Sequence, residues 1–355
     1  MYSVIMAGGV GKRFWPRSRK DRPKQLLNIL NDQSMLRVTF DRLHNISDYH
    51  EIFIITNQVQ AAAIREEIPE LPEENLLIEP FGKNTAPAIA LSTINILALD
   101  EDAVMGVFPA DHLIMKEDVF YTDFQKAIEA LQDKNCLVTF GIKPTRPATG
   151  YGYIQYDTKK PLVEEKVYKV KTFAEKPNYN TAQRFLQSGD FLWNSGIFVW
   201  KADTILRQMK AHMPELYDSA MTIRDALGTE DYYQIVEREW KTLRSESVDY
   251  GVMEKSGNVY VVRGEFFWSD LGSWTSVYEL ADKDDQENVV RGEALLLEST
   301  GNYVYSPDRF VATVGLDNMV IINTEDVTMV VERSKAEEVK KLVASLGKKE
   351  MREYL

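Results

Sequence analysis

Short apolar runs rich in β-branched residues alternate with amphipathic stretches over the first 140 residues. The apolar runs predict strands at Val4–Met6, Ile52–Ile55, Val104–Phe108 and Leu137–Phe140. Apolar residues three or four positions apart predict a helix near Met35 after a Ser34 cap, a helix over Ala86–Leu99 after a Thr85 cap, and a helix over Phe124–Leu131. Strands that alternate with helices are typical of a doubly wound α/β sheet, mixed but mostly parallel, whose ligands bind at the carboxyl ends of the strands.

The pattern loosens into an α+β stretch after residue 150, and the charged segment KDDQEN at 283–288 has no apolar periodicity. Short strands are predicted beyond it at Val289–Val290, Ala294–Leu297, Tyr303–Tyr305, Phe310–Val314, Met319–Ile322 and Val327–Val331. Their close spacing indicates a small all-β appendage, a short β-solenoid, followed by an amphipathic helix over Ser334–Leu346. We therefore expect two domains, residues 1–282 and residues 283–355.

Composition narrows the class of protein. The 355 residues are 44% hydrophobic and 27% charged, as in ordinary folded domains, and the net charge of −12 argues against a nucleic-acid-binding surface. No apolar run is long enough to cross a bilayer, and the start, MYSVIMAGGVGKR, has no basic segment typical of a signal peptide. The single cysteine, Cys136, leaves no disulfide framework. We expect a cytoplasmic protein that binds neither membranes nor nucleic acid.

Basic residues nevertheless gather around a glycine turn. Seven lysines and arginines lie between Lys12 and Lys24, against one acid, Asp21, which indicates either a small polyanionic ligand or a solvated basic loop. The turn, Ala7-Gly8-Gly9-Val10-Gly11-Lys12-Arg13, directly follows a predicted strand. Backbone N–H groups of such a turn can approach phosphate oxygens, and Arg13 and Lys24 can neutralise them. The spacing matches neither a Walker A loop nor a Rossmann fingerprint, and a purely structural turn stays open.

Two carboxylates have positions that suit a metal ion. Asp111 follows Pro109 in FPADH, at the end of a predicted strand, and Asp270 lies in WSDLGSW. Mg²⁺ prefers hard oxygen ligands and commonly uses one or two protein carboxylates together with phosphates. The alternatives are a turn-forming Asp111 and an Asp270 that caps a helix.

Three further segments embed polar residues in apolar surroundings: Gly150, Tyr151 and Gly152 in TGYGYI, Glu175 and Lys176 in FAEKP, and Asn194 in WNSGIF. A sugar site needs a few acceptors and donors beside aromatic or glycine-lined walls, which Glu175 and Asn194 can supply, and Lys176 can bind a phosphate. An ion pair at a strand end and a simple turn are the alternatives.

Taken in order, these segments resemble the sugar-phosphate nucleotidylyltransferases, and most closely their mannose-1-phosphate guanylyltransferase branch. The resemblance covers roughly residues 2–332 and rests on AGGVGKRFWPRS with PKQ, EPFGKNTAPAIAL (79–91), FPADH, TGYGYI, FAEKP, WNSGIF, SVDYGVMEK (247–255) and WSDLGSW. It implies a Rossmann-like domain and a short C-terminal left-handed β-helix. Val10 departs from the Ser or Thr that is frequent in this glycine signature. Some relatives add a cupin isomerase domain, which we do not expect here.

The resemblance also implies an activity: GTP and mannose 1-phosphate form GDP-mannose and pyrophosphate, with Mg²⁺. The implied nucleotide site comprises Ala7, Gly8, Gly9, Gly11, Lys12, Arg13, Glu79, Asn84, Thr85, Pro109 and Asp111. Arg13, Lys24 and Asp111 would be catalytic, and Asp111 and Asp270 would hold the metal. Gly150, Tyr151, Gly152, Glu175, Lys176 and Asn194 would bind the sugar phosphate.

Two other functions stay open. Another pair of substrates, such as glucose 1-phosphate with UTP or dTTP, needs only a change in the pocket. A non-catalytic regulator that binds sugar nucleotides is the second alternative, although it would not need the phosphate cations and metal carboxylates. We also expect the appendage to support a homodimer, because short β-solenoid edges need covering.

Overall fold

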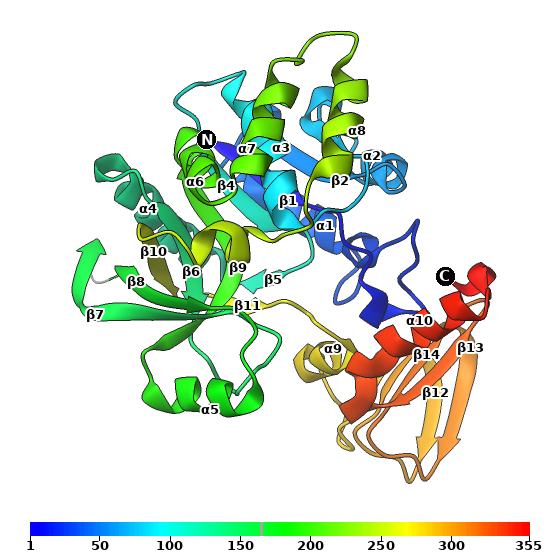
Figure 1. The fold of residues 1–355 in the computed structure, drawn as a ribbon. Coiled ribbons are helices and arrows are strands. Elements are labelled where there is room, and N and C mark those ends of the chain that lie inside the picture. The colour runs from blue at the N-terminus through cyan, green and yellow to red at the C-terminus, as the bar shows by residue number, and fades with distance from the viewer. Residues whose placement is uncertain (164–165) are drawn as a thin grey trace.

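A computed structural model of the chain describes residues 1–163 and 166–355, and the side chains of all of these except residues 133 and 160. Its larger part is built on a nine-stranded sheet with the order β3-β2-β1-β4-β9-β6-β10-β8-β7 (Figure 1). The strands are β1 (Tyr2–Met6), β2 (Ile52–Asn57), β3 (Leu76–Glu79), β4 (Val104–Pro109), β6 (Leu137–Ile142), β7 (Tyr153–Val163), β8 (Val167–Ala174), β9 (Phe191–Lys201) and β10 (Val259–Gly264).

Only part of this sheet is parallel. Strands β3, β2, β1 and β4 pair in parallel, whereas β9 lies antiparallel between β4 and β6. Within the described residues four strand pairs are parallel and five antiparallel, so the expectation of a mostly parallel sheet is wrong for the sheet as a whole. Parallel pairing needs a crossover of a dozen or more residues. Three residues separate β7 from β8, which leaves no room for one.

Helices cover both faces of the sheet, as the sequence predicts. Val4 packs in a core with α3, α6, α7 and α8, and the next residue, Ile5, packs in a second core with α1, α2 and α4. Successive side chains of a strand point to opposite faces, so each interior strand serves both cores. The helices are α1 (Met35–His44), α2 (Ala61–Glu67), α3 (Thr85–Leu97), α4 (Glu117–Asp133), α5 (Tyr179–Ser188), α6 (Ala202–His212), α7 (Pro214–Arg224) and α8 (Tyr232–Thr242).

The predicted caps have different outcomes. The Ser34 hydroxyl accepts a hydrogen bond from the Arg37 N–H at 3.0 Å, so this N-cap is confirmed. Thr85 is not a cap but the first residue of α3. Asn84 is the N-cap instead, and its side-chain oxygen accepts from the Thr85 N–H at 2.9 Å. The predicted helix at 124–131 is the C-terminal half of the longer α4.

A separate two-stranded sheet pairs β5 (Leu113–Met115) with β11 (Phe267–Ser269), and α9 (Trp274–Leu280) follows β11 in the chain. A small four-stranded sheet begins after residue 288. Its strands are β12 (Val289–Leu297), β13 (Tyr303–Val314), β14 (Met319–Asn323) and β15 (Thr328–Glu332). Four of the predicted strands merge into β12 and β13, because both strands continue through one register shift, between Gly292 and Ala294 in β12 and between Ser306 and Val311 in β13. Strands β12, β13 and β14 are parallel, which makes the unit β-helix-like, and β15 is antiparallel. A 3₁₀ turn (Arg333–Glu338) precedes α10 (Val339–Lys348).

Buried asparagines hold the successive turns of this unit together. Asn302 is fully buried and donates from Nδ2 to Asn288 Oδ1 at 3.0 Å and to the Leu316 carbonyl at 2.6 Å. Its own Oδ1 accepts from the Met319 N–H at 2.9 Å. The stacked strands therefore depend on side-chain amides as well as on their backbone ladder.

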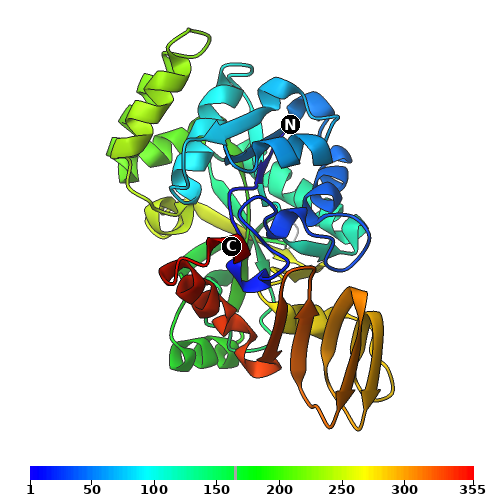
Figure 2. The same ribbon diagram turned by 90° about the vertical axis from the view of Figure 1, so that its right-hand side faces the viewer.

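A third core joins this unit to the N-terminal loop. Phe14 packs on Trp274, which stacks on Tyr303, with ring centroids 4.9 and 5.6 Å apart. In both views the C-terminus and α10 lie beside the dark blue N-terminal loop, and Trp15 Nε1 donates to the Tyr354 carbonyl at 2.6 Å (Figures 1 and 2). Because the two units share a core, the division at residue 282 stays a prediction. No helix among the described residues is long and apolar enough to span a membrane.

Candidate active site

The glycine turn follows β1, and side chains of neighbouring segments donate hydrogen bonds to its carbonyl oxygens. Gln25 donates from Nε2 to the carbonyls of Ala7 and Gly9 at 2.9 and 3.0 Å, and the Thr56 hydroxyl donates to Ala7 O at 3.0 Å. The six backbone N–H groups of residues 8–13 make no hydrogen bond to the described part of the protein. A run of unpaired N–H groups with its carbonyls turned away is a concave anion site.

Two glycines let this turn lie directly against functional side chains. Gly11 has a φ of +67°, and a Cβ there would lie 2.2 Å from the Lys24 Cβ. A Cβ on Gly8 would lie 2.8 Å from Oε1 of Glu79. Any side chain at either position would displace Lys24 or Glu79, so the close approach requires glycine.

Lys24 joins three parts of the chain at one point. It is 5% exposed, and Nζ donates to Asp111 Oδ2 at 2.9 Å, to the Asp111 carbonyl at 3.1 Å and to the Asp270 carbonyl at 2.6 Å. Asp111 follows the end of β4, and Asp270 directly follows β11. The three predicted residues therefore meet below the glycine turn, although they are far apart in the sequence.

The charges of this junction are strongly coupled. Burial opposes ionisation of Asp111, but the charges of Lys24 and His112 and the hydrogen bond from Lys24 outweigh it and hold the pKa of Asp111 below its ordinary value. The Tyr151 hydroxyl donates to Asp270 Oδ1 at 2.6 Å. Burial and the negative charge of Asp270 raise the pKa of Tyr151, so this phenol keeps its proton and donates.

The residues present fit a magnesium ion that also binds phosphates. Asp111 and Asp270 supply two ionisable oxygen donors beside the anion site, and one or two protein carboxylates are what Mg²⁺ commonly uses in phosphate complexes. The described residues contain no group of three or more histidines, cysteines, aspartates and glutamates that could hold a metal.

A cavity of about 380 Å³ opens beside the junction, at the carboxyl ends of β1 and β4. Its wall includes Met6, Gly8, Gly9, Ile55, Glu79, Gly82, Asn84, Thr85, Ala88, Ile89, Val107, Pro109, Asp111, Gly196, Phe198 and Asp249. The predicted nucleotide residues Gly8, Gly9, Glu79, Asn84, Thr85, Pro109 and Asp111 are thus brought together around one space.

Glu79 contributes an unusual carboxyl group to this wall. Its side chain is 5% exposed, and burial raises its pKa to about 7, opposed by a hydrogen bond from the Lys83 backbone. The neighbouring Thr85 hydroxyl accepts from the Val248 N–H at 2.9 Å and so ties the start of α3 to the segment after α8. Glu79 can therefore either donate or accept near neutral pH.

Four of the predicted sugar residues, Gly152, Glu175, Lys176 and Asn194, lie next to one another. A Cβ on Gly152 would lie 2.3 Å from Oε2 of Glu175, and Glu175 pairs with Lys176 at 2.8 Å. The Asn194 N–H donates to the Gly152 carbonyl at 2.8 Å. Gly150 is exposed, and a Cβ there would meet no atom within 4 Å.

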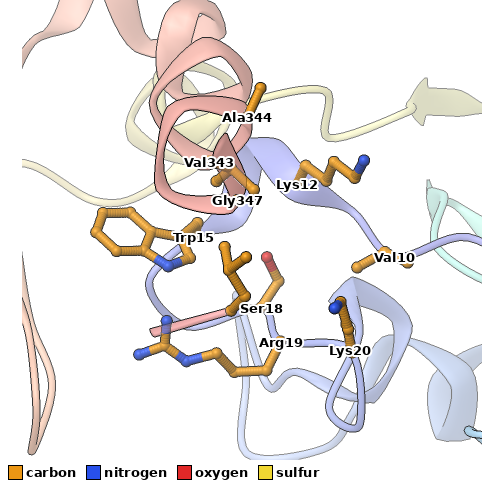
Figure 3. A pocket seen from close by; sticks show the side chains of 10 residues that line it. Val10, Lys12, Trp15, Ser18, Arg19, Lys20, Val343, Ala344 and Gly347 are labelled. Carbon is orange, nitrogen blue, oxygen red and sulfur yellow. The ribbon is translucent and has the colours of Figure 1, made fainter. Parts of the chain in front are cut away.

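The two basic residues of the turn lie outside this cavity. Arg13 is half-buried, and its Nε is buried without a hydrogen-bond partner among the described residues. Lys12 lines a further cavity of about 190 Å³ between the turn and α10, where Val343 and Gly347 lie near Trp15 (Figure 3). The C-terminal helix therefore covers the outer side of the turn.

Comparison with known proteins agrees with this geometry. The sequence profile of the nucleotidyl transferase family matches residues 2–287, four fifths of the chain. The chain belongs to this family. A second profile, the MannoseP isomerase/GMP-like beta-helix domain, matches residues 292–346 of this nucleotidyltransferase.

Its relatives form one branch of the family. The nucleotidyltransferase is 38% identical over 354 residues to a mannose-1-phosphate guanylyltransferase of Klebsiella pneumoniae and to one of Escherichia coli, and each alignment covers 99% of this chain and 75% of the relative. A crystal structure described as mannose-1-phosphate geranyltransferase from Thermus thermophilus superposes with a TM-score of 0.88. Its sequence identity is 31%, and the match covers 98% of this chain and 99% of that one.

Sequence reasoning missed four residues of this nucleotidyltransferase site. Gln25 lies in the PKQ segment and Asp249 in SVDYGVMEK, and the sequence predicts no role for either. Thr139 lies inside an apolar strand, and its hydroxyl donates to Asn194 Oδ1 at 2.9 Å. His112 is half-buried and accepts at Nδ1 from Trp268 Nε1 at 3.2 Å, and desolvation lowers the pKa of its imidazole. The sequence signal for His112 was its place beside Asp111, whereas nothing local marks Thr139.

Proposed function

We propose that this chain is a mannose-1-phosphate guanylyltransferase that forms GDP-mannose and pyrophosphate from GTP and mannose 1-phosphate. The observation that carries the proposal is the junction of Lys24, Asp111 and Asp270 below a turn of six unpaired N–H groups. The relatives that are mannose-1-phosphate guanylyltransferases supply the substrate pair, and the geometry supports the reaction type.

The reaction needs positioning and charge stabilisation more than acid–base groups. A phosphate oxygen of mannose 1-phosphate attacks the α-phosphorus of GTP in line, a new P–O bond forms, and the bond to the bridging oxygen breaks as pyrophosphate leaves. The attacking phosphate is already an anion, so no general base is required. What remains is to hold two polyanions together and to stabilise the negative charge of the transition state.

We assign the triphosphate to the glycine turn. The unpaired N–H groups of Gly8, Gly9 and Gly11 would donate to its oxygens, and Ala7 and Lys12 flank them in the sequence. Arg13 has an unpartnered buried Nε that a phosphate oxygen can accept from. Lys24 is assigned to the α-phosphate, which requires it to exchange one of its three present acceptors for phosphate oxygen.

The base and the sugar are assigned to opposite parts of the same site. Glu79, Asn84, Thr85 and Pro109 line the part for guanine, whose N1–H and amino group offer two adjacent donors to the Glu79 carboxylate. Uracil and thymine offer only one donor there. Gly150, Tyr151, Gly152, Glu175, Lys176 and Asn194 are assigned to mannose 1-phosphate.

Asp111 and Asp270 would hold Mg²⁺. When bound, the ion neutralises phosphate charge and polarises the phosphorus under attack. The Tyr151 hydrogen bond to Asp270 and the Lys24 bonds to Asp111 orient these two carboxylates in its absence. The division into residues 1–282 and 283–355, a left-handed winding of the β-helix-like unit, a homodimer and a cytoplasmic location complete the proposal, as the sequence predicts them.

Pyrophosphate release tests the function directly. Purified protein with Mg²⁺ and mannose 1-phosphate is given each nucleoside triphosphate in turn. Release with GTP, with GDP-mannose as the co-product, is the expected result. Release with UTP or dTTP alone would overturn the base, and release only with glucose 1-phosphate would overturn the sugar. Tight binding of GDP-mannose without any turnover would indicate a regulator in place of an enzyme.

A further inference from the structure

The segment SVDYGVMEK, residues 247–255, makes hydrogen bonds to residues assigned to the guanine and to the sugar. The Val248 N–H donates to the Thr85 hydroxyl, at the start of α3, where the cavity is lined by the residues assigned to guanine. At the other end of the segment, Glu254 accepts at Oε1 from the Glu175 N–H at 3.1 Å. Between these two contacts a π-helical turn (Asp249–Met253) brings Asp249 into the wall of the cavity.

Asp249 controls the orientation of Asn194. It accepts at Oδ1 from Asn194 Nδ2 at 2.9 Å, while Asn194 Oδ1 accepts from the Thr139 hydroxyl at 2.9 Å. These two contacts make opposite demands on the amide, so they distinguish its oxygen from its nitrogen. Asp249 itself lines the cavity, while its Oδ1 is engaged by Asn194.

A second carboxylate, that of Glu175, lies near Asp249. Glu175 is half-buried beside Gly152, and its partner Lys176 is largely exposed. Burial, and then the negative charge of Glu175, raise the pKa of Asp249 to about 6. Two neighbouring carboxylates favour a ligand that offers several hydrogen-bond donors and no negative charge at that point. The hydroxyl-bearing ring of a hexose is such a ligand.

We propose that Asp249 accepts a hydrogen bond from a ring hydroxyl of the hexose 1-phosphate, beside the contacts of Glu175 and Asn194, and so determines specificity for the sugar. This rests on the proposed function, because it assigns the residue to the sugar end of that site. It gives the SVDYGVMEK segment a direct contact with substrate. The alternative is that Asp249 only orients Asn194.

The isosteric variant Asp249→Asn separates these roles. Its side-chain oxygen can still accept from Asn194, but the atom toward the cavity becomes an NH₂ group, which cannot accept from a hydroxyl. A hydrogen bond to a charged group contributes enough that the KM for mannose 1-phosphate should rise about 10- to 100-fold. The KM for GTP should change less than about threefold, and the melting temperature should not fall, because the raised pKa shows that the charge at Asp249 is costly in the folded state.

Glu246→Gln is the matched control. Glu246 lies just before the same segment, pairs at 3.8 Å with Lys255 outside the cavity, and loses the same charge when substituted. Its KM for mannose 1-phosphate should equal that of the wild type. KM values for monodeoxy analogues of mannose 1-phosphate are also measured with the wild type and with Asp249→Asn. The analogue that lacks the hydroxyl bound by Asp249 should have nearly the same KM with both proteins.

Each outcome decides the proposal. A raised KM for the sugar phosphate together with one non-additive analogue supports it. An unchanged KM in a wild type that releases pyrophosphate with mannose 1-phosphate would assign Asp249 to the orientation of Asn194 alone, while the proposed function stands. A wild type that releases pyrophosphate with neither mannose 1-phosphate nor another hexose 1-phosphate would overturn the proposed function and this inference together.

Discussion

The pH dependence of stability that Glu79 contributes tests whether its carboxyl group is shielded from water in the cavity. Its carboxyl group is almost completely buried next to Gly8, and burial raises its pKa from 4.5 to about 7. The folded protein therefore holds a proton at Glu79, between about pH 4.5 and 7, that the unfolded chain releases. Stability contributed by this proton is present below pH 4.5 and is lost as the pH rises through 7.

Glu79→Gln removes this pH dependence because the amide does not ionise. One pH unit of pKa difference corresponds to about 1.4 kcal/mol, so the raised pKa of Glu79 costs the wild type about 3 kcal/mol above pH 8. Between pH 5 and pH 8 the free energy of unfolding of the variant, relative to wild type, should increase by about 2–3 kcal/mol. Urea unfolding of both proteins at the two pH values, followed by circular dichroism, measures this difference.

Glu74→Gln is the control for the loss of one carboxylate, because Glu74 is exposed before the same strand. It should show no pH-dependent difference from wild type. If Glu79→Gln also differs from wild type by the same amount at pH 5 and pH 8, the carboxyl group is hydrated in the folded state. The cavity beside Gly8 would then be open to water, and the reasoning from burial would be refuted.

Three further variants, one of them with a matched control, test the site and the fold. Asp111→Asn should reduce pyrophosphate release about 10²- to 10³-fold with an unchanged circular dichroism spectrum, and a near-normal rate would remove Asp111 from the site. Gly11→Ala should lower the melting temperature, because its Cβ would collide with Lys24 at positive φ. Gly9→Ala, whose Cβ meets no atom within 4 Å, should not, so equal losses would contradict this account. Asn302→Ala should cost about 2–4 kcal/mol in urea unfolding, since three buried hydrogen bonds are lost, and an unchanged midpoint would show that they are dispensable.

Local sequence patterns were sufficient where local physics decides the outcome. The strand at Val4–Met6 follows from a short apolar run, and the Ser34 cap follows from one side chain that reaches three residues ahead. The Thr85 cap failed because Asn84, one residue earlier, has an equally good acceptor and also adopts a φ of 70°, which asparagine tolerates better than threonine. The strands of the appendage were found, but their continuity through a bulge was not.

The site followed partly from a topological rule. Residues after β1 and β4 were predicted to gather because carboxyl ends of parallel strands share an edge, and these two strands are neighbours. Lys24 and Asp270 are 246 residues apart, and only the resemblance to a family put them in one site before their contact was seen. The contact between Asn194 and Asp249 had no sequence signal, because it joins an antiparallel strand to a turn after α8.

The sequence by itself determined the elements, the glycine turn with its cations, and the ordered segments that identify a nucleotidyltransferase. These depend on backbone preference, side-chain periodicity and residue identity within a few positions. Only the tertiary structure decided that β9 enters antiparallel between β4 and β6, and that Lys24 binds two carbonyls and a carboxylate. It also decided that α10 covers the turn. These contacts join distant segments, and their formation depends on which apolar faces are buried together rather than on any neighbour in the chain.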